Sequence, residues 1–386
     1  MWIPITGPSG INVAVLLAAL MLGLWFWKML VIREGLQISA SRVTLPVLLF
    51  LAISILAFGM GQIPWFVFAN QAPLDAQAGG FTIFVLSAGT LLMTAHIVQE
   101  ERWLQIVVWA FIGLGAIYLV GRALGISRMD TLYHRGFTAN SMFWTWLIAL
   151  SLSQALFNEK ISSQVRALLI GIVLVTFYVA VVQAYNWKSG WIPALVAAAV
   201  LMGLRFRRLL LLSIPFGLIG AYIVAISAIG SDAYSWGTRL DAWKIVLEIS
   251  KVNPVLGLGF SNYYWYTPLF SIRGWFVNFN SHSQYVDLIA QVGILGLFCF
   301  LWIFFEIGRL SWKLQKDLPN GFARSYAYGV FAGVIGTLMA AFLVDWILPF
   351  VYNIGFNGFR ASIWVWIFLG GLIAVQRIYS GKTKTQ

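Results

Sequence analysis

The chain has 386 residues, of which 60% are hydrophobic and only 10% are charged, and its mean hydropathy is +0.84. This composition excludes an ordinary soluble domain and indicates an integral membrane protein. The formal net charge of +12 is explained by membrane orientation rather than by nucleic-acid binding, because no basic run is interleaved with aromatic residues on a soluble segment. The single cysteine, Cys299, lies in an apolar segment, so we expect neither disulfides nor a thiol-ligated metal.

Apolar stretches of the roughly 20 residues that a helix needs to cross a bilayer recur along the whole chain. They predict transmembrane helices over residues 11–32, 43–63, 80–98, 103–121, 138–157, 167–185, 190–204, 209–229, 285–308, 326–348 and 358–376. The expected fold is therefore all-α, a single membrane domain over residues 1–386 with a polytopic bundle of about 11 transmembrane helices. The first residues show neither the basic region nor the cleavage site of a signal peptide, so we expect the first predicted helix to remain in the mature protein.

Lysine and arginine are concentrated in alternate connections and in the C-terminal tail. Because basic connections stay on the cytoplasmic side, this asymmetry predicts a cytoplasmic C-terminus. The one long connection, residues 230–284, then lies on the extracytoplasmic face, where we expect it to carry much of the active site.

Two shorter connections on the same face contain candidate site residues. "DTLYHRGFTAN" supplies His134 and Arg135, and "YNWKSGW" places Lys188 with Ser189 and Gly190 at the start of a helix. An ammonium beside unpaired backbone N–H groups can bind an anion. The alternative for Lys188 is a side chain that extends to lipid phosphates.

The first half of the long connection predicts a helix that does not span the membrane. An apolar stripe with spacings of 4, 3 and 4 residues is typical of a helix lying in the headgroup plane, and its members are Trp236, Leu240, Trp243 and Leu247. Arg239 lies at the margin of this stripe, at the depth of the lipid phosphates. Pro254 ends the helix.

The following stretch, "GLGFSNYYWYTPLF", combines backbone freedom with aromatic side chains. Gly257 and Gly259 permit a tight backbone path. The aromatic cluster is either an interfacial belt or a platform for a sugar, and consists of Tyr263, Tyr264, Trp265 and Tyr266.

His282 stands where the long connection meets the ninth predicted span. Ser281 and Gln284 have the spacing of a capping box, which would place His282 in the first helical turn. The helix N-terminus disfavours imidazolium, and a neutral imidazole can act as a general base. The alternative is a solvated or hydrogen-bonded polar residue without a catalytic role.

Gln284, Asp287 and Gln291 recur on one face of the same span. Polar side chains within a bilayer usually face the bundle interior and take part in function. Asp287 can instead be an exposed carboxylate at the interface.

These residues, in this order, resemble the superfamily of O-antigen ligases and polymerases, bacterial polytopic membrane glycosyltransferases. The resemblance covers residues 170–310 and rests on Lys188 with Ser189 and Gly190, on Arg239 ahead of Trp243, and on "NPVLGLGF" and "NSHSQYVDLIAQVGILG". Members commonly have twelve spans, so the count here suggests a missing first helix.

The resemblance implies transfer of a glycan from a polyprenyl diphosphate to an acceptor hydroxyl of a glycan, lipid-glycan or protein, without metal or other cofactor. The reaction would take place on the outer face of the bacterial inner membrane. By the resemblance, His282 matches the essential histidine and Arg239 a diphosphate-binding arginine. Lys188 stands where the family has another diphosphate-binding arginine. Because lysine departs from that pattern, Arg135 and Arg273 are alternative candidates for the same role. Asn280, Ser281, Gln284, Tyr285 and Asp287 would support the site, with Gly257 and Gly259 in its loop.

Two other functions stay open at this point. A transporter or flippase of lipid-linked glycans would have polar residues near the bilayer midplane and broken helices. The shape and division proteins that polymerise cell-wall glycan use an aspartate in a loop, and Asp232 and Asp241 are the candidates for it here. Most polar signals here gather at the outer surface, which favours an extracytoplasmic enzyme.

Overall fold

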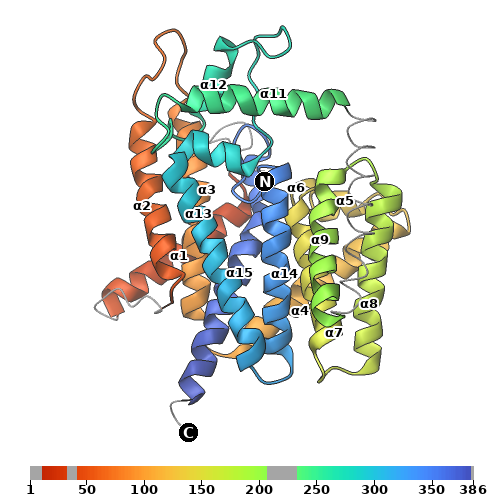
Figure 1. Cartoon of the computed structure of the whole chain (residues 1–386). Coiled ribbons are helices and arrows are strands. Elements are labelled where there is room, and N and C mark those ends of the chain that lie inside the picture. Colours follow the sequence, from red (N-terminus) through yellow and green to blue (C-terminus); the bar gives the residue numbers. More distant parts are fainter. Residues whose placement is uncertain (1–10, 33–40, 207–232, 384–386) are drawn as a thin grey trace.

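The computed structural model describes residues 11–32, 41–206 and 233–383 (Figure 1). The described residues form 14 α-helices and no strand. They are α1 (Val13–Trp27), α2 (Thr44–Met60), α3 (Leu74–Ile97), α4 (Glu101–Ala123), α5 (Met129–Leu132), α6 (Arg135–Thr138), α7 (Ser141–Phe157), α8 (Ser163–Tyr178), α9 (Lys188–Arg205), α11 (Ala233–Ser250), α12 (Asn262–Tyr266), α13 (Gln284–Asp317), α14 (Phe322–Leu343) and α15 (Gly355–Thr383).

Six of these helices are long and apolar enough to cross a membrane, namely α1 with the π-helical turn that continues it, α3, α4, α13, α14 and α15. Shorter apolar helices are α2, α7 and α8. The chain is therefore a polytopic membrane protein, as its composition predicts. The predicted span 209–229 and Asp232 lie outside the described residues.

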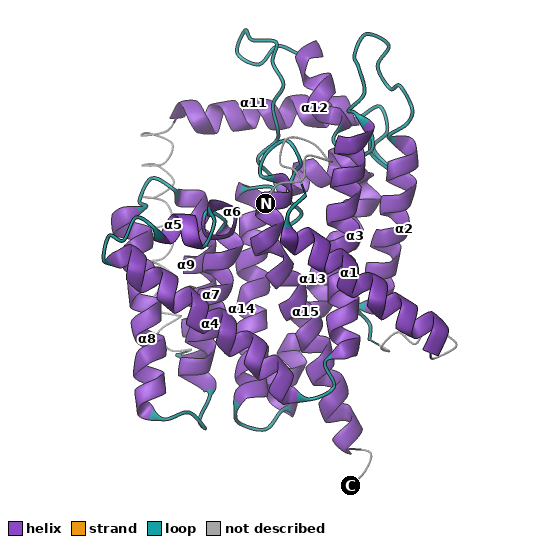
Figure 2. Cartoon of the chain, turned by 180° about the vertical axis from the view of Figure 1, so that it is seen from behind, coloured by secondary structure: helices purple, strands orange, loops and turns teal. Residues whose placement is uncertain are grey.

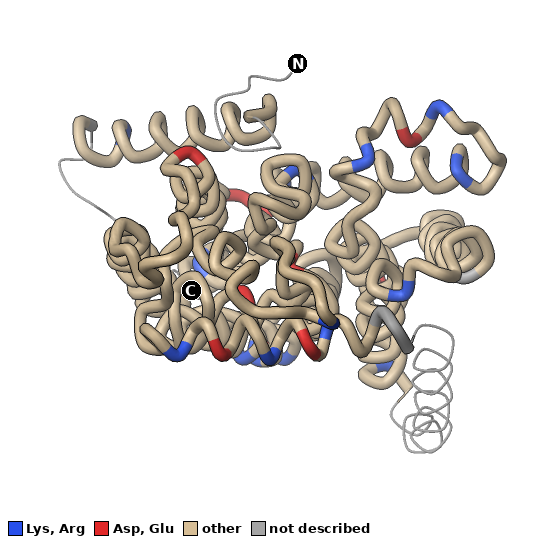
Figure 3. Tube along the Cα trace, turned by 90° about the horizontal axis from the view of Figure 1, so that it is seen from above, with Lys and Arg blue, Asp and Glu red and all other residues tan. Residues whose placement is uncertain are grey.

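The helices at the centre of the bundle are buried, whereas those at its periphery expose apolar side chains. In α7 every residue from Ser141 to Ala155 is buried, because the helix packs against α8, α9 and α14. In α1, by contrast, only Val15 and Ala18 are buried. Charged positions are sparse along the described part of the trace (Figure 3). This distribution suits a protein whose outer surface faces hydrocarbon.

Helix α11 lies across one end of the bundle, nearly at right angles to the long helices (Figures 1 and 2). We call this end the loop end; it carries α11, α12, the short helices α5 and α6, and the α14–α15 connection, residues 344–354. The C-terminus lies at the opposite end. On α11, Leu240 and Leu247 of the predicted stripe are exposed, whereas Trp236 and Trp243 pack against the protein. The stripe is thus exposed at two positions and packed against protein at the other two.

A break in α13 at Gly293 is filled by backbone from the long connection. Gly293 has a φ of 71°, and the segment 254–259 hydrogen-bonds across the break, with the Leu258 N–H donating to the Ala290 carbonyl at 2.8 Å and the Ile294 N–H to the Pro254 carbonyl at 2.8 Å. Gly257 and Gly259 have φ values of 74° and 85°. The tight backbone path predicted for these two glycines is therefore confirmed.

Candidate active site

His282 lies two residues before α13, with a left-handed backbone φ of 49°. The predicted capping box is wrong. Ser283 is the residue that precedes the helix, and the Ser281 hydroxyl donates to the Ser283 carbonyl at 2.9 Å and accepts from the Ser283 N–H at 3.2 Å. The serine pair therefore closes a small turn that presents the half-buried imidazole ahead of the helix rather than within its first turn.

The α14–α15 connection brings a buried carboxylate, Asp345, to His282. The Asp345 side chain is 0% exposed and accepts hydrogen bonds from Asn280 at 3.0 Å and Asn353 at 2.7 Å. Burial raises the pKa of Asp345 above its usual range, and the nearby His282 and these two amides oppose that rise. Asn280 therefore lies in the same hydrogen-bonded group as the carboxylate that faces the histidine.

Three neighbouring influences act on His282. Burial lowers its pKa, the Asp345 carboxylate raises it, and the Arg239 guanidinium lowers it, so that the net pKa lies below the usual value. The imidazole is therefore mainly neutral near pH 7, the form that can accept a proton.

Arg239 reaches this group from α11. Its guanidinium donates to the carbonyl of Leu343, the last residue of α14, at 3.1 Å, and lies over the Trp236 ring with 5.7 Å to the ring centroid. One turn further along α11, the Trp243 indole N–H donates to the Ser281 carbonyl at 2.7 Å. Helix α11 is thus hydrogen-bonded both to the end of α14 and to the turn that carries His282.

Gln284 and Tyr285 connect the start of α13 with α14 and the connection after it. The Gln284 side-chain oxygen accepts from the backbone N–H groups of Ile347 at 3.2 Å and Leu348 at 2.9 Å, and the Tyr285 hydroxyl donates to the Leu338 carbonyl at 2.6 Å. These contacts hold the Asp345 segment in place against His282.

Asp287 is fully buried within α13. The sequence left two positions for its carboxylate, the bundle interior or an exposed site at the interface, and in the structure it lies in the bundle interior. Its carboxylate accepts from Gln291 at 2.7 Å and from Gln284 at 3.4 Å, and the Gln291 side-chain oxygen accepts from the Ser261 N–H at 3.0 Å. The polar face predicted for this helix therefore ties α13 to the long connection.

Lys188 is the first residue of α9, as predicted from the sequence. Its ammonium lies over the Tyr185 ring, 5.9 Å from the centroid. The adjacent Trp187 ring lies 5.9 Å from that of Trp346, which follows Asp345 directly. The start of α9 thus adjoins the connection that bears Asp345.

The two arginines that could substitute for Lys188 lie elsewhere. Arg273 forms an ion pair with Asp241 of α11 at 3.0 Å, and Asp241 is on the opposite face of that helix from Arg239. Arg135 begins α6, at the loop end, and lines two cavities.

The aromatic cluster is mostly a small core rather than an interfacial belt. Tyr263 and Tyr266 are 0% exposed and pack under α11, and burial raises the pKa of both hydroxyls. Tyr264 stacks on Tyr352 with 4.5 Å between the ring centroids, and the Trp265 indole donates to the Tyr352 hydroxyl at 2.9 Å. These residues support the α14–α15 connection from the side of α12.

Asp345 is the residue that the sequence reasoning missed. It is the one acidic residue in the apolar stretch "AAFLVDWILPF", and an ionisable residue in such a stretch indicates function by default. The predicted span 326–348 enclosed it, whereas α14 ends at Leu343. Among the described residues, no group of three or more His, Cys, Asp or Glu side chains is arranged to hold a metal ion.

Comparison with known proteins supplies a family match. No curated protein matches the chain. The model of a family described as O-antigen ligase matches residues 160–301, from just before α8 to the middle of α13. This range includes Lys188, Arg239 and His282. The chain therefore carries a domain of the O-antigen ligase family, which is a family of bacterial membrane enzymes.

Proposed function

We propose that the protein is a glycosyltransferase that moves a glycan from a polyprenyl diphosphate to an acceptor hydroxyl, in the manner of an O-antigen ligase or polymerase. The observation that carries this proposal is that a buried carboxylate and an arginine both act on a neutral histidine near the end of α14, within or beside the family domain. The family implies lipid-linked glycan substrates, and this group of residues supplies the chemistry for using them.

In the proposed reaction, His282 accepts the proton of the acceptor hydroxyl while the oxygen attacks the anomeric carbon. The new glycosidic bond forms on the face opposite the diphosphate, the bond from that carbon to the diphosphate oxygen breaks, and the configuration inverts. The leaving diphosphate is already an anion, so cations that stabilise its charge replace a general acid. Asp345 stabilises the imidazolium that results.

Arg239 and Lys188 are the proposed cations. The Arg239 guanidinium, which donates to the Leu343 carbonyl, has the planar fork geometry that matches phosphate oxygens. Lys188 adds a point charge at the start of α9. No metal or other cofactor takes part in the proposed mechanism.

The membrane position of α11 suits a lipid-tethered donor. Its exposed Leu240 and Leu247 can enter the bilayer interface while Arg239 faces the end of α14. We propose that the loop end is extracytoplasmic, that residues 230–284 are its main connection, and that the chain has about 11 spans when the undescribed 209–229 is counted.

The test is a transfer assay with purified protein in lipid nanodiscs, a polyprenyl-diphosphate oligosaccharide and candidate acceptors. We expect His282→Ala to lower turnover by about 100-fold or more, and Arg239→Ala by a similar factor. His96→Ala, near the end of α3 that lies away from the loop end, and Lys244→Ala, an exposed cation on α11, are the matched controls and should keep wild-type turnover.

Two results would contradict the proposal. Full turnover by His282→Ala would remove the general base. Movement of the lipid-linked glycan across liposomes, without a new glycosidic bond, would instead indicate a flippase.

A further inference from the structure

Two adjoining cavities lie at the loop end, and the first of them is lined in part by the α14–α15 connection. The first has a volume of about 370 Å³ and is lined by His134, Arg135, Tyr352, Asn353 and Asn357, among others. The second, of about 290 Å³, is lined by parts of α4, α5, α6 and α7 and by the segment before α9, and includes Arg122, Asp130, Trp144 and Trp187. Arg135 and Ala139 line both cavities, so Arg135 stands between them.

Each cavity reaches a residue that contacts the Asp345 segment. Asn353, in the first cavity, donates to the Asp345 carboxylate at 2.7 Å. Trp187, in the second, packs against Trp346. A molecule held in these cavities would therefore extend toward the proposed site of transfer.

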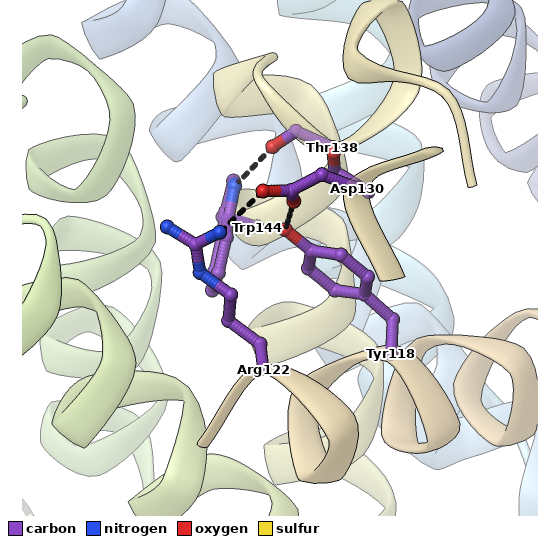
Figure 4. Close-up of polar contacts among 5 residues, drawn as sticks. All are labelled: Tyr118, Arg122, Asp130, Thr138 and Trp144. Atoms are coloured by element: carbon purple, nitrogen blue, oxygen red, sulfur yellow. Dashed lines mark hydrogen bonds and ion pairs between the residues drawn. The ribbon is translucent and has the colours of Figure 1, made fainter. Parts of the chain in front are cut away.

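The charge that the cavities offer is that of Arg135. Among the described residues its guanidinium has no hydrogen bond or ion pair, whereas Arg122 is paired with Asp130, which also accepts from the Tyr118 hydroxyl at 2.9 Å (Figure 4). No carboxylate lines the first cavity. The pairing of Arg122 leaves each cavity with an excess positive charge from Arg135.

The other lining groups are those of a sugar site. Tyr352 in the first cavity and Trp144 and Trp187 in the second are aromatic, and Asn353 and Asn357 are amides. The Asn357 side-chain oxygen is buried and, within the described part of the chain, accepts no hydrogen bond. Pockets that combine apolar walls with a few polar groups fix the orientation of a small ligand.

We propose that these cavities bind one or two sugar units bearing an acidic group, with Arg135 bound to the carboxylate or phosphate. The sugars belong to a glycan substrate, and in that respect the inference rests on the proposed function. A guanidinium prefers a carboxylate or phosphate to a neutral hydroxyl because it can form two parallel charge-assisted hydrogen bonds.

The binding test does not depend on transfer. Purified protein in nanodiscs is titrated with α-1,4-digalacturonate and with α-1,4-galactobiose, which differ only in the two carboxylates, while tryptophan fluorescence is recorded. We expect about tenfold tighter binding of the acidic disaccharide, and loss of that preference in Arg135→Gln. Arg128→Gln, an exposed arginine that lines neither cavity, should keep it.

Equal affinity for the two disaccharides, binding of neither, or an equal loss in Arg128→Gln would overturn the inference. His282→Ala should bind digalacturonate as wild type does, so failure of the proposed mechanism and failure of this site are distinguishable. In transfer assays Arg135→Gln should raise KM for the substrate whose glycan occupies the cavities, either donor or acceptor. A fall in kcat with both KM values unchanged would contradict substrate binding there.

Discussion

The two charges beside His282 act on its pKa in opposite directions, Arg239 lowering it and Asp345 raising it. We therefore predict that Asp345→Asn lowers the pKa of His282 further, and that Arg239→Gln raises it. Because the base must be neutral, the acidic limb of kcat/KM should move to lower pH in the first variant and to higher pH in the second. The two shifts of opposite sign distinguish electrostatics from a general loss of structure.

Direct titration is practicable because the chain has three histidines. Nitrogen-15 NMR of histidine-labelled protein, with His96→Gln and His134→Gln for assignment, measures the imidazole itself. Lys244→Gln, an exposed cation elsewhere on α11, is the control and should leave the titration of His282 in place. Shifts of the same sign in both site variants would refute the opposing roles of Asp345 and Arg239.

His282, Arg239 and Lys188 could be proposed from the sequence because each stands in a local motif with a recognisable chemistry. Asp345 could not be paired with His282 in that way. The two residues are far apart in the chain, and their proximity depends on the end of α14 at Leu343 and on the contacts of Gln284 with the connection that follows. Hydropathy alone extended the span past that point, since Val344, Trp346, Ile347 and Leu348 are themselves apolar.

At the scale of the elements, helix α13 is broken at Gly293, and the segment 254–259 packs into this break. Gly293 has a positive φ, and a Cβ there would overlap the Val255 carbonyl. Gly293→Ala should lower the midpoint of thermal unfolding in detergent by several degrees, since a strained residue costs on the order of 1–3 kcal/mol. Gly113→Ala is the matched control, because Gly113 lies within α4 and has no neighbour within 4 Å of an added Cβ. A Gly293 variant as stable as this control would contradict the packing argument.

The sequence predicted most helices but not the details of their ends. Hydropathy located α2, α4 and α7 within a few residues because each is one uninterrupted apolar stretch. The cap of α13 was mispredicted because Ser281 and Gln284 had the right spacing but other partners: the Ser281 hydroxyl bonds to Ser283, and Gln284 bonds to residues 347 and 348. A local sequence pattern cannot show that residues distant in the chain compete for the same hydrogen-bonding side chain.

For the whole molecule, the decisive question is which side of the membrane the loop end faces. The opposite end carries a dense group of basic residues: Arg309, Lys313, Lys316, Arg324 and Arg377. From the positive-inside rule we predict that this end is cytoplasmic and that His282 and Arg239 are on the outer face. The same orientation is needed if a glycan assembled on a lipid carrier is to be transferred to a cell-surface molecule.

This orientation predicts the chemical accessibility of single cysteines. Cys299→Ala removes the chain's single cysteine by deleting one buried sulfur atom and gives a background without cysteine. In that background, a membrane-impermeant maleimide should label Lys251→Cys, at the end of α11, in intact spheroplasts. Lys316→Cys, at the end of α13, should react only after the membrane is permeabilised; both lysines are exposed in the fold, so burial does not explain the difference. Labelling with the opposite pattern would place His282 in the cytoplasm, where a surface-glycan acceptor could not reach it.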